Sequence, residues 1–328
     1  MDGLFVWGAA AALSLLLHAC IASPEAGTTA APPLTDLKWL APSSDRVALL
    51  TTVWPDNLSG TDARGRGPLE VELGRIAFRS PALLGGVAAR QGLSCQTCHP
   101  AGRANEAFFL AGLSESPGSV DTTTSVFSKK LGDGVFNPVR IPSLEGAVAS
   151  APYGHDGREP SLDAFIHMVA VDEFAGPAPS PRVLAAVLAY VSGIEPFPKG
   201  AARVPLTVAS DCGELAREAD VLDALLEGLD GEAADFVVFA MRHQIGRMHE
   251  RFPGAKLADA RAALEALSLS LREVRNLIDG ARLDEAGAKL AAWRGRLQAA
   301  RTTLAAGEEA SLYNPVRLDA ALRRHSVR

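Results

Sequence analysis

Apolar residues in the last third of the chain recur at alternating intervals of three and four, the spacing of one face of an α-helix. The longest such run consists of Leu257, Ala260, Leu264, Leu267, Leu271, Val274, Ile278 and Ala281. A second run follows at Leu283, Ala286, Leu290, Trp293, Leu297, Ala300 and Leu304. Asp279-Gly280 lies near the break between them, so the pattern predicts two antiparallel helices.

Two further amphipathic helices are predicted immediately upstream. The first is marked by Leu215, Ala219, Leu222, Leu225, Leu226 and Leu229, and the second by Phe236, Val237, Ala240, Met241, Ile245 and Met248. Pro253-Gly254 ends the second helix. Residues 206–328 are therefore predicted to form an antiparallel helical bundle.

The pattern is different over residues 36–205. Apolar runs are short there, Gly and Pro recur, and no strand alternation persists. Short helices joined by long loops fit this pattern. The predicted fold class is all-α, with a loop-rich domain over 36–205 followed by the bundle.

The first residues are typical of an export signal. Residues 4–19 are apolar apart from Ser14 and His18, a run too short for a membrane-spanning helix. Residues 21–35 are small, polar and rich in Pro, as in a flexible tether. The end of the signal, residues 1–20, resembles a lipoprotein signal, in which Cys20 would carry the lipid and anchor the protein to a membrane. The alternative is a plain cleaved signal with an incidental cysteine.

The composition excludes two classes of protein. The 328 residues carry a net charge of −6, and Lys and Arg are scattered, so nucleic acid is not an expected partner. Four cysteines are too few for a scaffold built on disulfides. Two of them stand in Cys95-Gln96-Thr97-Cys98-His99.

This motif has three possible explanations. A redox dithiol gives the adjacent histidine no role, and zinc usually needs a second cluster of ligands. Covalent haem accounts for all three residues, because Cys95 and Cys98 would bond to the haem vinyl groups and His99 would be the proximal iron ligand. One covalently bound haem c is therefore predicted, and export fits because an unligated cysteine pair would tend to oxidise there.

Three flanking segments strengthen this prediction. They are Leu73-Gly74-Arg75-Ile76-Ala77-Phe78-Arg79-Ser80-Pro81, Asn137-Pro138-Val139-Arg140-Ile141-Pro142-Ser143-Leu144 and Ala151-Pro152-Tyr153-Gly154-His155-Asp156-Gly157-Arg158. With the haem motif, over about residues 70–195, they resemble one haem domain of the bacterial di-haem cytochrome c peroxidases and of the related di-haem oxidase that matures methylamine dehydrogenase. The resemblance implies a cytochrome c-like haem domain over 36–205. The family carries two such motifs and this chain has one, which puts the family's peroxidase chemistry in doubt.

The resemblance also implies an axial ligand near the helix that follows Ser161. Met168 is the favoured distal ligand, one residue short of the family position, and His167 is the alternative. If the distal face is open, His155 is the candidate acid–base residue for peroxide. Arg140 and Arg158 could pair with the haem propionates, or could be ordinary surface arginines.

The expected function is that of an exported monohaem c-type cytochrome that transfers one electron to or from a periplasmic redox protein. The alternative is a haem peroxidase or oxidase with an open distal site.

Overall fold

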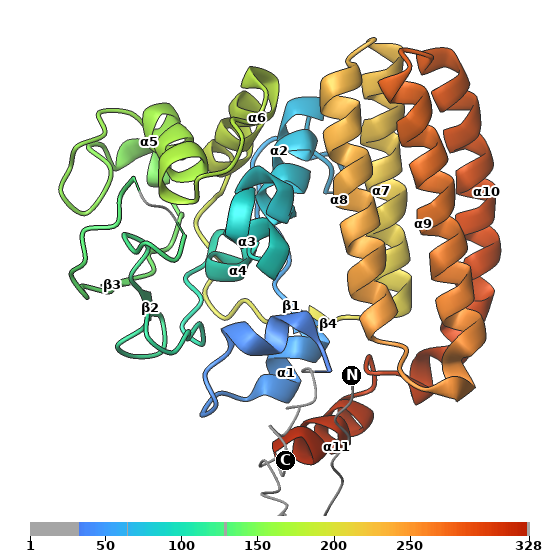
Figure 1. Cartoon of the computed structure of the whole chain (residues 1–328), viewed down its shortest axis with the longest axis horizontal. Coiled ribbons are helices and arrows are strands. Elements are labelled where there is room, and N and C mark those ends of the chain that lie inside the picture. The colour runs from blue at the N-terminus through green and yellow to red at the C-terminus, as the bar shows by residue number, and fades with distance from the viewer. Residues whose placement is uncertain (1–32, 64, 128–129, 327–328) are drawn as a thin grey trace, which may run out of the picture.

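A computed structural model describes residues 33–63, 65–127 and 130–326 (Figure 1). The predicted signal peptide, Cys20 and most of the tether lie outside the described residues. The chain is mainly helical and its few strands are two residues long, which confirms the all-α class. Long helices occupy one side of the molecule in Figure 1, and shorter helices with long loops occupy the other. No helix among the described residues is long and apolar enough to cross a lipid bilayer.

The loop-rich part contains short helices. These are α1 (Arg46–Thr51), α2 (Leu69–Arg79), α3 (Gly86–Gln91), α4 (Cys95–Cys98), α5 (Leu162–Met168) and α6 (Pro181–Ser192). A π-helical turn, Val169–Glu173, continues α5. Short 3-10 helices lie at Thr35–Trp39, Pro81–Leu83, Pro100–Gly102 and Ala147–Ala149. Strand β1 (Thr52–Val53) pairs antiparallel with β4 (Val204–Pro205), and β2 (Ser119–Val120) with β3 (Val139–Arg140).

Four long helices follow. They are α7 (Val208–Glu227), α8 (Gly231–Glu250), α9 (Ala258–Asp279) and α10 (Leu283–Gly307). Consecutive helices run in opposite directions, and α10 returns to pack against α7 (Figure 1). Most of the predicted apolar positions form their buried seams, but Leu229 and Ala281 are exposed and lie beyond the ends of α7 and α9. Trp293 is fully buried, and its indole N–H donates to the Leu267 carbonyl at 3.1 Å. The break predicted at Asp279-Gly280 is confirmed.

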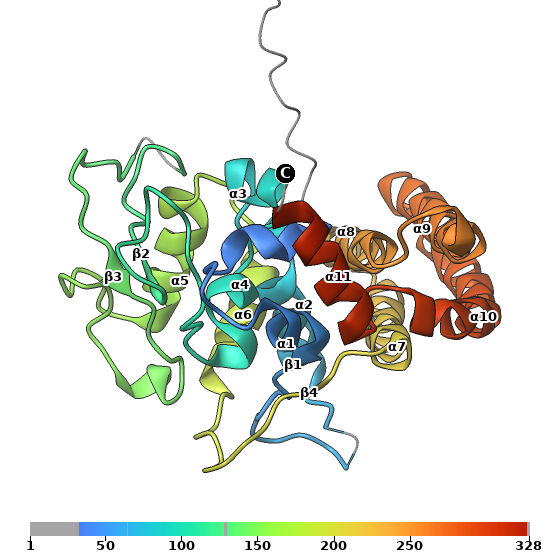
Figure 2. The ribbon, with the colours of Figure 1, turned by 90° about the horizontal axis from the view of Figure 1, so that it is seen from below.

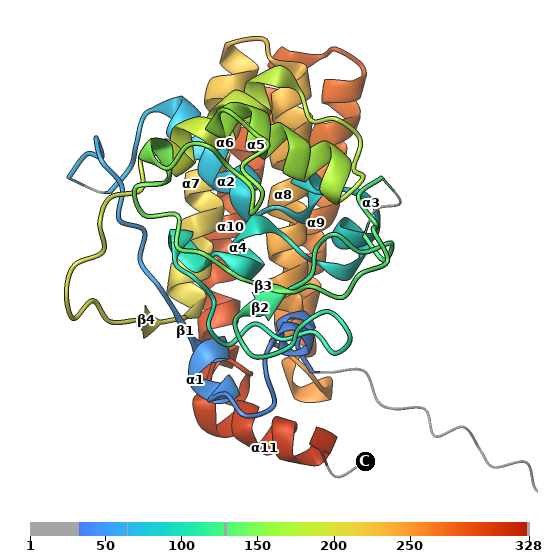
Figure 3. The same ribbon diagram turned by 90° about the vertical axis from the view of Figure 1, so that its left-hand side faces the viewer.

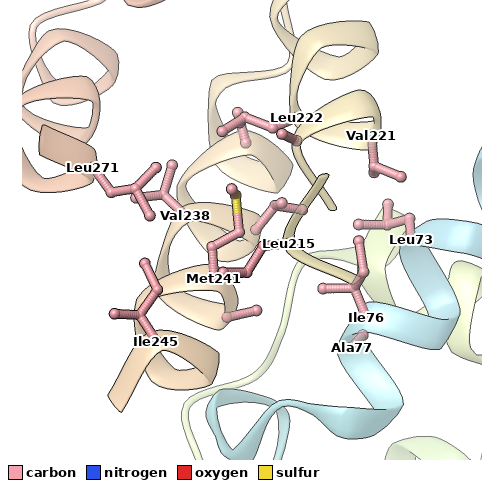
Figure 4. Close-up of a cluster of buried hydrophobic side chains, with 14 of the residues drawn as sticks. Leu73, Ile76, Ala77, Leu215, Val221, Leu222, Val238, Met241, Ile245 and Leu271 are labelled. Carbon is pink, nitrogen blue, oxygen red and sulfur yellow. The ribbon is translucent and has the colours of Figure 1, made fainter. Parts of the chain in front are cut away.

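The loop-rich part and the long helices share one hydrophobic core. Helix α2 packs against α6 on one side and against α7 and α8 on the other. Figure 4 shows Leu73, Ile76 and Ala77 of α2 facing apolar side chains of α7 and α8. Gly74 permits the contact with α6, because a Cβ there would lie 1.9 Å from the Ala186 carbonyl oxygen. The sequence boundary near residue 206 is therefore a change of pattern within a continuous core.

The last helix, α11 (Pro315–Ser326), leaves the long helices and packs beneath α1 (Figure 2). Leu312, Leu318 and Leu322 bury apolar surface there against Leu34, Leu37 and Leu50. Leu34 is only 3% exposed, and Thr35 donates its backbone N–H to the Glu250 carboxylate at 2.8 Å. Leu34 and Thr35 thus belong to the folded unit and not to the predicted tether.

Buried ion pairs join α2 to α7. Arg75 is completely buried and bonds to Glu72 at 3.1 Å and to Glu214 at 2.5 Å. Arg79 bonds to Asp56 at 2.7 Å and lies 3.5 Å from Glu214. A cavity of about 500 Å³ reaches from these groups to the Ser94 and Thr97 side of α4. Helix α2, which packs against α7 and α8, also contacts the short helix α4 that carries the two cysteines.

Candidate functional site

The cysteine motif forms the single turn of α4, which appears below α5 and α6 and to the left of α3 in Figure 3. Ser94 caps this turn through a reciprocal capping box with Thr97, whose hydroxyl oxygen accepts the Ser94 N–H at 3.1 Å. The His99 N–H donates to the Cys95 carbonyl at 2.8 Å. Because the turn is helical, Cys95 and Cys98 lie three residues apart on one face of α4.

His99 is held from a distant part of the chain. Its Nδ1 lies 3.0 Å from the Pro142 carbonyl oxygen, which can only accept, so Nδ1 carries the proton. Burial lowers the pKa of His99 to about 4, despite the opposing effect of this bond. The imidazole is thus neutral near pH 7, and its Nε2 lone pair is available to a metal. A histidine ligand usually donates its other ring N–H in this way.

The two thiols lie at the edge of an apolar cluster. Cys95 and Cys98 are half-buried and pack, with Leu110 and Val169, against ten buried residues. Those residues are Trp39, Leu84, Ala88, Leu93, Phe108, Leu113, Val120, Phe127, Ile141 and Phe174. Burial raises the pKa of Cys95 to about 12 and raises that of Cys98 as well, so both thiols are protonated at neutral pH.

This set of donors fits haem c. Haem needs two thiols, one neutral imidazole nitrogen and an apolar wall, and the residues around α4 supply all of them. Across the described residues, no group of three His, Cys, Asp or Glu side chains is placed to hold a metal ion.

The predicted distal ligands lie on a different face of their helix from Val169. Val169, the residue after Met168, packs against the apolar cluster that also holds the cysteines. Met168 is half-buried and His167 is exposed. Both line a surface pocket of about 770 Å³ together with Asp163 and Glu232. Adjacent helical residues point about 100° apart, so the structure brings Val169 to the cysteine side, while iron ligation by Met168 or His167 stays a prediction.

The remaining predicted residues lie on exposed loops and strands. His155 is exposed, and Asp156 binds Arg158 instead, with Arg158 Nε donating to a carboxylate oxygen at 2.6 Å. Arg158 thus forms an ion pair with Asp156. Arg140 is exposed on β3, whose partner strand is β2.

Two residues at the site were not singled out from the sequence. Pro142 lies in the Asn137–Leu144 segment, but only the fold shows that its carbonyl accepts a hydrogen bond from His99 Nδ1–H. Glu173 ends the π-helical turn after α5, and its charge contributes to the raised pKa of both thiols. The Ser161 cap predicted the start of α5, whereas no signal marked its continuation to residue 173.

No protein-family model, curated protein or solved structure matches the chain.

Proposed function

We propose that the chain is an exported monohaem c-type cytochrome, with a cytochrome c-like domain over residues 36–205 and an antiparallel helical bundle attached to it. Cys95 and Cys98 would be joined to the haem by thioether bonds, and His99 would be its proximal ligand. Haem supplies reversible one-electron chemistry at iron. The proposed reaction is electron transfer to or from a periplasmic redox protein.

The observation that carries this proposal is the bond from His99 Nδ1 to the Pro142 carbonyl at 3.0 Å. It fixes the tautomer in which Nε2 is free and fixes the orientation of the ring beside the two cysteines. A redox dithiol has no need of such an arrangement. The protonated thiols also suit haem attachment, in which each S–H adds across a vinyl group.

The proposal is tested on mature protein purified from a host that attaches haem c. Intact mass after acid–acetone extraction should exceed the polypeptide mass by one haem. Cys95→Ser/Cys98→Ser should lose the retained haem, whereas Cys212→Ser should keep it, because Cys212 lies in α7 and not in the motif. Haem that is extracted completely from the wild type, or zinc in its place, would overturn the assignment.

Attachment to a membrane through Cys20 is a separate part of the proposal. Cys20→Ser should move the protein from the membrane to the soluble periplasmic fraction. An unchanged distribution would favour the plain cleaved signal.

A second candidate function is peroxide chemistry at an iron with an open distal face. The position of Val169 favours it, because an aliphatic side chain that cannot bind iron occupies the family's ligand position. The optical spectrum of ferric protein separates the two functions. A low-spin spectrum that turns high-spin in Met168→Ala or His167→Ala supports the electron carrier, and a high-spin wild type unchanged by both supports peroxide chemistry.

A further inference from the structure

A carboxyl group lies on the cysteine side of the turn that follows α5. Val169 and Glu173 are the two ends of the π-helical turn, four residues apart, and therefore share a face. Val169 packs against the apolar cluster that holds Cys95 and Cys98. Phe174 is buried in the same cluster, with its ring 5.1 Å from that of Phe127. Glu173 thus lies on the face of the turn that Val169 directs toward the cysteine cluster.

The electrostatics agree with this placement. Burial is the main cause of the raised pKa of Cys95 and of Cys98, and the negative charge of Glu173 adds a smaller increase to both. Burial raises the pKa of Glu173 itself to about 7, against the opposing effect of a hydrogen bond from the Thr122 hydroxyl. Glu173 is thus an acid that titrates near neutral pH beside the attachment point of the proposed haem.

We propose that Glu173 is the residue that couples electron transfer at the haem to proton binding. This inference rests on the proposed function and deepens it. The ionised carboxylate stabilises ferric iron over ferrous iron, because the ferric centre carries one more positive charge. On one-electron reduction of the bound haem, the Glu173 carboxylate would take up one proton from solvent, and on reoxidation it would release that proton.

Other charged groups near Glu173 do not compete for this role. Cys95 and Cys98 lose their titratable S–H when they become thioethers. On the same helical segment, Asp172 forms an exposed ion pair of 2.6 Å with Lys130, and His167 is exposed. Solvent screens these exposed charges more strongly than it screens a half-buried carboxyl. Asp172 therefore provides a matched control.

The test is a potentiometric titration of the haem-loaded protein between pH 5 and pH 9. The wild-type midpoint potential should fall as pH rises through about 7, by at most a tenfold change in the redox equilibrium per pH unit, which is 59 mV for one electron. Glu173→Gln should abolish this slope and hold the potential at or above the acid limit of the wild type. Asp172→Asn should keep the slope.

A second variant covers the case in which Glu173→Gln does not accumulate. Thr122→Val removes the hydrogen bond that lowers the pKa of Glu173, so the sloping region should move to higher pH. A slope that persists in Glu173→Gln, that vanishes in Asp172→Asn or that does not move in Thr122→Val overturns the proposal while leaving the haem assignment intact. Absence of covalent haem from the wild type overturns both.

Discussion

The buried ion pairs between α2 and α7 allow a quantitative prediction for Arg75→Met. The Arg75 side chain is completely inaccessible, and the substitution removes its bonds to Glu72 and Glu214 while keeping most of its volume. Removing one partner of a buried ion pair costs about 3–5 kcal/mol, because the other charge is left unpaired. Glu72 retains Arg217 at 2.6 Å and the Gly67 N–H at 2.8 Å, whereas Glu214 retains the longer contact to Arg79 at 3.5 Å. We therefore expect Arg75→Met to lower the free energy of unfolding by about 3 kcal/mol, the lower end of that range.

The loss should depend on pH in a defined direction. Burial raises the pKa of Glu214, but the charges of Arg75 and Arg79 outweigh burial and hold it below 4.5. A carboxyl whose pKa is lowered by folding stabilises the protein above its unfolded pKa, and this stability is lost as pH falls through the folded value. Arg75→Met removes most of this contribution. The difference between variant and wild type should thus be largest near pH 7 and narrow below about pH 4.5.

Urea denaturation, followed by circular dichroism near pH 7 and again below about pH 4.5, measures this difference in the free energy of unfolding. Arg282→Met is the control, because Arg282 pairs with Glu285 at the surface and should leave the free energy of unfolding unchanged. Adding Glu214→Gln to Arg75→Met should recover part of the loss, since it removes the unpaired charge. A loss no larger than that of Arg282→Met, or one independent of pH, would refute the reasoning.

Three further predictions follow from the packing and the buried charges. Burial, followed by the charge of Glu214, raises the pKa of Glu218 to about 8. Glu218→Gln should therefore exceed the wild type in free energy of unfolding by more than about 1 kcal/mol at pH 9 and match it at pH 5. An equal gain at both pH values would contradict the raised pKa of Glu218. Gly74→Ala should lower the free energy of unfolding by about 1–3 kcal/mol, because the added Cβ meets the Ala186 carbonyl. Gly246→Ala has no neighbour within 4 Å of the added Cβ, and should stabilise α8 by up to about 1 kcal/mol in the same denaturation assay. Leu318→Ala should loosen α11 and speed tryptic cleavage after Arg323, since Leu318 is fully buried. Val316→Ala is the control, because Val316 is 76% exposed. Equal cleavage rates in the two variants would show that the burial of Leu318 does not hold α11 in place.

The long helices could be predicted from the sequence because their signal is local. The three-and-four spacing and the breaks at Pro253-Gly254 and Asp279-Gly280 gave α7 to α10 with boundaries close to those observed. Helix α11 was missed, because its apolar residues bury against Leu34, Leu37 and Leu50 from the far end of the chain. The shared core was missed for the same reason, since nothing local in α2 shows that it faces α7 and α8.

At the candidate site, the motif identified residue types but not their surroundings. Cys95, Cys98 and His99 could be chosen from spacing alone, whereas the Pro142 carbonyl lies 43 residues further along the chain. Met168 was favoured over His167 as the distal ligand, whereas Val169 is the residue that packs against the apolar cluster with the cysteines. Which residue at the end of α5 faces this cluster depends on packing, and the spacing of residues along the helix does not show it. Glu173 was overlooked because the continuation of α5 as a π-helical turn has no clear sequence signal.

The contact between α11 and Leu34, Leu37 and Leu50 has a consequence for biosynthesis. Ribosomes make a chain from its N-terminus, so these three leucines are translated long before the residues that cover them. The small core that they share with Leu318 and Leu322 cannot close until the final helix has been synthesised. The segment with Leu34, Leu37 and Leu50 is thus among the first to be translated but is packed only after α11 has been made. A chain truncated before residue 312 leaves these leucines without their apolar cover.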